Sequence, residues 1–332
     1  MARSADCDAR AGADSAGADG LHQFVDWRHA FDGRGERDDL SSGQGAQIDN
    51  TLELDVVTGN GDLVTCSDTQ NANLFQAVLG GLGQCAIIVR ATLKLIPAPA
   101  NARVFDMIYP ALEPLMADFR TLLLDERFSY LEGLVVPLPT GGYVYILEGV
   151  SFYGGTAPNN AALLAGLNFI PGTVTPMDET YFAFCDRLKA AEDGLTAIGR
   201  WSLPHPWVDL FVPGSQATGF IGSTLAQLTF ADVPDFPNLI YGFRKSRMHR
   251  PLLRIPDEEV FFLFDVLRTT DPAKVADAVA QNRVFYEGAR ALGGSFIRSV
   301  RCPFQRTIGS GISERSMGGW RRRSGCMIRR RF

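Results

Sequence analysis

The chain has 332 residues, of which 46% are hydrophobic and 21% are charged, and its formal net charge is −5. This is the composition of an ordinary globular protein, long enough for one large domain or two of common size. No apolar run approaches the roughly 18 residues of a membrane span, and the start of the chain lacks the apolar core of a secretory signal, so we expect a soluble protein, cytoplasmic rather than secreted.

The first part of the chain changes character near residue 43. Residues 1–42 have almost no apolar periodicity and are expected to be disordered. Residues 52–57 and 63–66 are β-rich runs that flank Asn60-Gly61, which predicts a hairpin because both residues tolerate positive φ. A short helix is expected next, followed by a long strand that Pro97 and Pro99 end. These two elements span residues 73–79 and 86–96.

The segment after residue 99 alternates irregularly between strands and helices. The strand spacing is too short for regular βαβ units, so the pattern predicts an α+β fold with a largely antiparallel sheet. Strands are expected at residues 103–109, 130–136, 143–148, 207–211, 239–243 and 260–268. Helices are expected at residues 114–124, 160–166, 179–192, 216–229 and 272–292.

The C-terminal region is strongly basic. Residues 298–332 hold ten arginines and a single acid, Glu314. Such a tail can bind an anionic partner, but it lacks interleaved aromatic residues and any folded nucleic-acid motif, so we expect no nucleic-acid binding. The six cysteines show no paired CxxC spacing, which argues against a zinc site or a disulfide framework.

Few residues stand out as candidates for chemistry. The glycines of Gly80-Gly81-Leu82-Gly83 lie between an expected helix and the strand that follows it. A dinucleotide-binding loop has the reverse order, from strand to helix, so this cluster favours a helix end with a tight turn. His205 lies in a proline-rich turn that favours a structural role, and neither it nor His249 has the spacing of metal ligands. Glu132 interrupts an apolar strand. Its carboxylate either points to solvent or lines a ligand pocket.

Several motifs of the chain occur together in one known family. They begin at Gly45-Ala46-Gln47-Ile48-Asp49-Asn50, are densest over residues 45–99 and extend to about residue 293. The further motifs are Leu52–Gly59, Val64–Ser67, Asn73–Phe75, Ala77–Gln84, Ile87–Ala91, Pro97–Pro99, Tyr130–Gly133 and Pro204–Pro213. Together they resemble the cytokinin dehydrogenases, flavoproteins of the vanillyl-alcohol-oxidase/p-cresol-methylhydroxylase (VAO/PCMH) superfamily.

The resemblance implies a function and a set of site residues. It implies an FAD-dependent oxidoreductase that oxidises a secondary amine, an N6-isoprenoid adenine, by hydride transfer to the flavin followed by hydrolysis of the imine. Ile88 is expected on the strand whose backbone contacts the flavin. Glu132 is expected to line the substrate entrance and bind the substrate, with Trp207 and His205 as weaker candidates for substrate binding. No catalytic residue is assigned.

The ends of the chain depart from the family pattern. The histidine segment that usually carries covalent FAD has no counterpart, and we expect no stable flavin-loaded enzyme from this chain. Read in a shifted frame, residues 27–40 can encode the Gly-Gly-Thr-Leu-Ser segment of the family, and residues 301–329 its closing segment. There, Met327 before Ile328 forces the aspartate codon of Tyr-Asp-Pro. We therefore interpret both ends as products of frameshifts.

The sequence thus predicts four regions: a shifted-frame segment at 1–42, the C-terminal part of a PCMH-type FAD-binding domain at 43–98, an antiparallel-sheet substrate domain at 99–293, and a shifted-frame tail at 294–332. Two alternatives stay open, namely an FAD oxidase of a sugar or alcohol and a non-catalytic remnant. The sequence leaves oligomeric state and electron acceptor undetermined.

Overall fold

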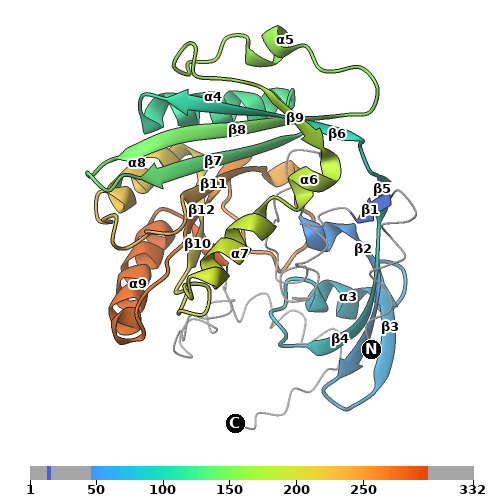
Figure 1. Cartoon of the computed structure of the whole chain (residues 1–332). Coiled ribbons are helices and arrows are strands. Elements are labelled where there is room, and N and C mark those ends of the chain that lie inside the picture. The colour runs from blue at the N-terminus through green and yellow to red at the C-terminus, as the bar shows by residue number, and fades with distance from the viewer. Residues whose placement is uncertain (1–12, 16–45, 298–332) are drawn as a thin grey trace.

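The computed structural model describes residues 13–15 and 46–297 (Figure 1). Its strands are β1 (Ala13–Ser15), β2 (Thr51–Thr58), β3 (Leu63–Ser67), β4 (Ala86–Leu93), β5 (Leu95–Pro97), β6 (Asn101–Tyr109), β7 (Tyr130–Pro137), β8 (Tyr143–Tyr153), β9 (Met177–Thr180), β10 (Val208–Pro213), β11 (Asn238–Arg244), β12 (Val260–Val266) and β13 (Ser295–Ile297). Its helices are η1 (Gln47–Asn50), α3 (Ala72–Val78), α4 (Leu112–Asp125), α5 (Asn160–Leu164), α6 (Tyr181–Cys185), α7 (Leu188–Ala197), α8 (Gly214–Leu225), η2 (Lys245–Arg247), η3 (Pro272–Lys274) and α9 (Val275–Ala291).

The largest unit is a sheet of eight strands in the order β13-β10-β12-β11-β7-β8-β6-β9. Every neighbouring pair in it is antiparallel. The α+β class with an antiparallel sheet is therefore confirmed. A second sheet, β3-β2-β4, lies at the lower right of Figure 1, and β1 pairs with β5 nearby.

The two faces of the large sheet have different partners. Because side chains alternate along a strand, β7 directs Leu131 and Val135 into the core shared with α4, α8 and α9. Phe119 of α4 approaches the same face at Gly133, where a Cβ would lie 3.4 Å from the Phe119 ring and 3.0 Å from the Ile240 side chain. The opposite face, which carries Glu132, is crossed by α6 and α7 (Figure 1).

The small sheet begins with the predicted hairpin. The turn between β2 and β3 closes through two backbone hydrogen bonds between Thr58 and residues 61 and 62, each 2.9 Å long, and Gly61 has φ +89°. On the inner face of this sheet, Leu54, Val56 and Cys66 pack against Phe75 of α3.

A loop of the large sheet joins the two sheets. Arg250, between β11 and β12, is buried, and its guanidinium donates to the carbonyl oxygen of Ile48 (3.1 Å) and to Asp68 (3.0 Å). Met248 and Leu253, which flank it, pack against the apolar cores of both sheets. The two parts of the chain are therefore held together by a charged and an apolar contact.

The structure corrects several predicted boundaries. The segment expected as one helix at 179–192 is instead β9, which pairs with β6, followed by α6 and α7. Thr180 sets the start of α6, because its side chain accepts a hydrogen bond from the amide of Ala183, and the helical segment is then interrupted at Asp186 and Arg187. The strand expected at 86–96 is divided into β4 and β5.

Two short strands fall within segments expected to be disordered or shifted in frame. β1 lies within residues 1–42, and β13, which pairs with β10, lies beyond the expected boundary at residue 293. The rest of these two terminal segments lies outside the described residues.

Candidate functional site

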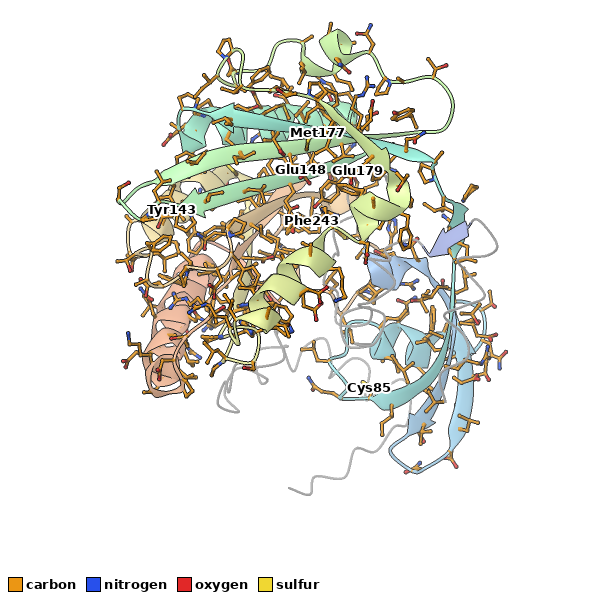
Figure 2. The ribbon with its side chains drawn as sticks, in the orientation of Figure 1. Cys85, Tyr143, Glu148, Met177, Glu179 and Phe243 are labelled. Carbon is orange, nitrogen blue, oxygen red and sulfur yellow. The ribbon has the colours of Figure 1, made fainter. Side chains whose placement is uncertain are left out.

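Three carboxylates form a row across the face of the large sheet opposite α4, α8 and α9. Glu132 of β7 is paired in register with Glu148 of β8, and Glu148 is paired with Asp106 of β6. Paired residues of neighbouring strands share a face, so the three side chains are neighbours. Figure 2 shows Glu148 near the middle of this face, with Phe243 of β11 below it. The sheet thus gathers acids that lie up to 42 positions apart in the sequence.

Glu132 is the buried member of this row. Its exposed fraction is 4%, so the interpretation in which it simply points to solvent is wrong. The hydroxyl of Tyr130 donates to its Oε2 at 2.6 Å, and the hydroxyl of Tyr241 donates to its Oε1. Tyr130 precedes Glu132 by two residues on the same strand, and Tyr241 is next in register on β11, after the pair formed by Ile240 and Gly133. Two phenols therefore fix both carboxylate oxygens.

A cation lies beside this carboxylate. Arg187, between α6 and α7, places Nη2 3.7 Å from Oε2 of Glu132 and 3.1 Å from the Tyr130 hydroxyl, to which it donates. Its guanidinium also stacks over the ring of Phe184, 3.8 Å from the ring centre. A buried carboxylate needs such hydrogen bonds and charge partners to remain ionised.

The negative charge of the row affects its outer member. Burial by its neighbours, and then the charge of Glu132, raise the pKa of Asp106 above its usual value. The row therefore presents carboxyl oxygens that can accept hydrogen bonds. Such a row suits a ligand that presents N–H groups, because each carboxylate oxygen can accept more than one hydrogen bond.

Ile88 lies on β4, away from this row. Its side chain packs against the core of the small sheet, while β4 is an edge strand among the described residues. The pairing with β2 shifts between Ile88 and Arg90, so Val89 is bulged out of register and exposed. An edge strand leaves backbone donors and acceptors available to a ligand, and bulges are common beside ligand sites.

Trp207 lies on the same sheet face as Glu132 but not beside it. Trp207 directly precedes β10, and β12 and β11 run between β10 and β7, so the lateral separation alone is roughly 14 Å at the usual strand spacing. Its indole N–H donates to the carbonyl of Arg268 at 3.0 Å, and its ring packs against His205 and Phe236. The structure does not bring Trp207 and Glu132 together.

His205 and the glycine cluster have structural surroundings. The ring nitrogens of His205 lie 3.0 Å from the Trp201 carbonyl and 3.3 Å from the Thr269 hydroxyl. Gly80 and Gly83 have φ of +73° and +70°, as expected where a helix ends in a tight turn. Among the residues that the structure describes, no group of three or more His, Cys, Asp or Glu side chains could hold a metal ion.

Sequence reasoning missed Tyr130, Tyr241 and Arg187. A signal for Tyr130 was present, because residues two apart on a strand share a face with Glu132. No local signal points to Tyr241 or Arg187, which depend on strand order and on the path of α6. Within the described ranges, no helix is long and apolar enough to cross a membrane.

Solved structures identify the class of fold. The VAO-type flavoprotein MtVAO615 of Myceliophthora thermophila superposes with a TM-score of 0.62 at 18% identity, covering 88% of this chain and 56% of that one. The BBE-like 1 protein of Physcomitrella patens gives a TM-score of 0.60 at 14% identity, covering 85% and 63%. The fold is that of the VAO/PCMH-type flavoproteins.

Sequence comparison finds a matching family model and relatives that include cytokinin dehydrogenases. Residues 135–291 match the family model described as "Cytokinin dehydrogenase 1, FAD and cytokinin binding", so the chain carries a cytokinin dehydrogenase-like domain. Cytokinin dehydrogenase 5 of Oryza sativa subsp. japonica is 36% identical over 283 residues, covering 73% of this chain and 53% of that protein. An uncharacterized oxidoreductase, ORF5 of the fasciation locus of Rhodococcoides fascians, is 34% identical, covering 76% and 58%. The chain spans about half the length of these relatives.

Proposed function

We propose that this chain supplies the substrate-binding part, and one wall of the flavin site, of an FAD-dependent oxidoreductase that acts on N6-isoprenoid adenines. The proposal assigns residues 43–98 to the flavin-binding domain and residues 99–293 to the substrate domain. It rests chiefly on one observation: Glu132 is a buried carboxylate whose two oxygens accept hydrogen bonds from tyrosines, on the face of the sheet opposite α4, α8 and α9.

The described residues fit a flavin ring in one respect. The β4 edge at Ile88, with Val89 bulged beside it, offers backbone N–H and carbonyl groups of the kind that a flat heterocycle with alternating donors and acceptors requires. When bound, FAD would supply the hydride acceptor for the carbon next to the amine nitrogen. The protein's own part is to hold the β4 backbone and the purine in place.

Glu132 performs the recognition step in this proposal. Its carboxylate accepts an N–H of the purine, while Tyr130 and Tyr241 prevent the carboxylate from rotating away. Because these groups are already ordered, little conformational entropy is lost when the ligand binds. Trp207 would contribute apolar contact to a more distant part of the ligand.

Calorimetric titration of the full chain with N6-isopentenyladenine tests this function. The wild-type chain is expected to bind, and Glu132→Gln is expected to bind at least about tenfold more weakly, since it loses a charged acceptor. Glu287→Gln is the matched control, because Glu287 lies on α9, which packs on the other face of the sheet. Equal affinity of the wild type and Glu132→Gln would contradict the proposal.

Two further measurements separate the alternatives. Binding of glucose or benzyl alcohol in place of the purine would favour an oxidase of sugars or alcohols. The visible absorbance of the purified chain tests the expectation that it retains no flavin, and a flavin spectrum would contradict that expectation.

A further inference from the structure

Arg187 occupies the junction of two helices that cross the site. It follows α6 and precedes α7, and its Nη1 donates to the carbonyl of Phe184 at 2.9 Å, in the last turn of α6. The same guanidinium stacks on the Phe184 ring and donates through Nη2 to the hydroxyl of Tyr130. Tyr130 in turn donates to Glu132. A continuous chain of hydrogen bonds therefore runs from this junction to the carboxylate.

The charges around Glu132 make its contact with Arg187 important for the ionisation of the carboxyl group. Among the described residues, the titratable groups that face it include Tyr130 on its own strand, Glu148 on β8, Tyr241 on β11 and Arg187, with Asp106 of β6 acting on it from the end of the row. Of these groups, the two other acids oppose its ionisation and Arg187 alone is cationic. A cation within about 4 Å favours the charged form of a carboxyl group.

We propose that Arg187 is a positioning residue: it keeps the Glu132 carboxylate ionised and, through Tyr130, oriented to receive an N–H of the substrate. This inference deepens the proposed function and rests on it. Arg187 is not expected to touch the substrate, because its guanidinium is engaged by Phe184, Tyr130 and Glu132.

The remainder of α7 provides a control for a purely structural role. The helix buries none of its residues, and just beyond its other end Arg200 pairs with Asp235, Nε to Oδ1 at 2.7 Å. Arg200→Met therefore removes a guanidinium that anchors the chain at the end of α7, and it leaves the charges next to Glu132 unchanged. If Arg187 only anchors the helix, the two methionine variants should behave alike.

The test is a titration of the Glu132 carboxyl followed by ¹³C NMR in the full chain, with the signal assigned from its loss in Glu132→Gln. Arg187→Met is expected to move the midpoint upward by about one pH unit. Arg187→Lys, which retains the charge, should restore most of the wild-type midpoint, and Arg200→Met should leave it unchanged. An unchanged midpoint in Arg187→Met, or the same shift in Arg200→Met, would overturn the inference.

A second variant guards against misfolding. Arg187→Gln keeps a donor for Tyr130 but lacks the charge, so it should give the same upward shift if the charge acts.

Purine titration is a separate measurement. A chain that shows the midpoint shifts but does not bind N6-isopentenyladenine refutes the proposed function. A chain that binds it equally well with and without Arg187, at every pH between 5 and 8, refutes the positioning role.

Discussion

Arg250 and Asp49 form an ion pair between the two sheets, with Nε and Oδ1 3.3 Å apart and side-chain exposures of 7% and 5%. The arginine comes from the β11–β12 loop and the aspartate from the short helix η1. Arg250 also lies over the ring of Phe75, 5.1 Å from its centre. One side chain therefore neutralises a buried acid and packs against the core of the small sheet.

The first prediction concerns this pair. Arg250→Met should lower the free energy of unfolding by about 3 kcal/mol, because it leaves the Asp49 carboxylate buried without its cation. Arg247→Met is the control, because Arg247 is exposed and its pair with Glu126 should contribute less than about 1 kcal/mol. Urea denaturation measures both, and equal losses in the two variants would show that Arg250 is not a special link.

The second prediction concerns pH. Burial is the main cause of the raised pKa of Asp49, against the lowering effects of the His249 amide and Arg250. The folded state therefore binds this proton more tightly than the unfolded state, so the contribution of Asp49 to stability falls as pH rises from about 4 through the raised value. Asp49→Asn should lack this component. Urea denaturation at several pH values between 4 and 7 should show that the free energy of unfolding of the variant increases relative to that of the wild type as pH rises. A difference that does not change with pH would contradict this prediction.

The third prediction concerns packing beneath α4. A Cβ at Gly242 would lie 3.0 Å from both the Leu123 and the Phe119 side chains. Gly242→Ala should therefore cost about 1–3 kcal/mol, as overpacked cores do. Gly219 is the control, because it is exposed on α8 and a Cβ there would meet nothing within 4 Å. Gly219→Ala should be neutral or stabilise by up to about 1 kcal/mol. Thermal unfolding measures both variants. A lowered unfolding temperature in Gly242→Ala, with an unchanged or raised one in Gly219→Ala, would support this account of the core.

Local patterns predicted most of the elements, because alternation along strands and turn residues are local properties of the sequence. The hairpin at Asn60-Gly61 is an example. Short strands such as β9 and β13 were missed because their stability comes from pairing with β6 and β10, which no local pattern reveals. The single helix expected at 179–192 is found as two helices, α6 and α7, which begin after the capping residue Thr180 and are separated at Asp186 and Arg187.

The candidate site was predictable only in part. Glu132 could be noticed because an acid in an apolar strand is unusual, but its burial depends on partners from β11 and α6 that lie far away in sequence. Trp207 shows the reverse case. The resemblance grouped it with Glu132, whereas strand order separates the two residues and places Trp207 in an aromatic cluster of its own.

Met248 and Leu253 each pack against both apolar cores, and this sharing has a thermodynamic consequence. Because the small sheet shares these core residues with the large sheet, unfolding of the small sheet would expose apolar surface of the large sheet as well. The described residues should therefore lose structure in a single cooperative step, with one heat-absorption peak in calorimetry. Amide protons in β2 and in β11 should then exchange through the same opening event.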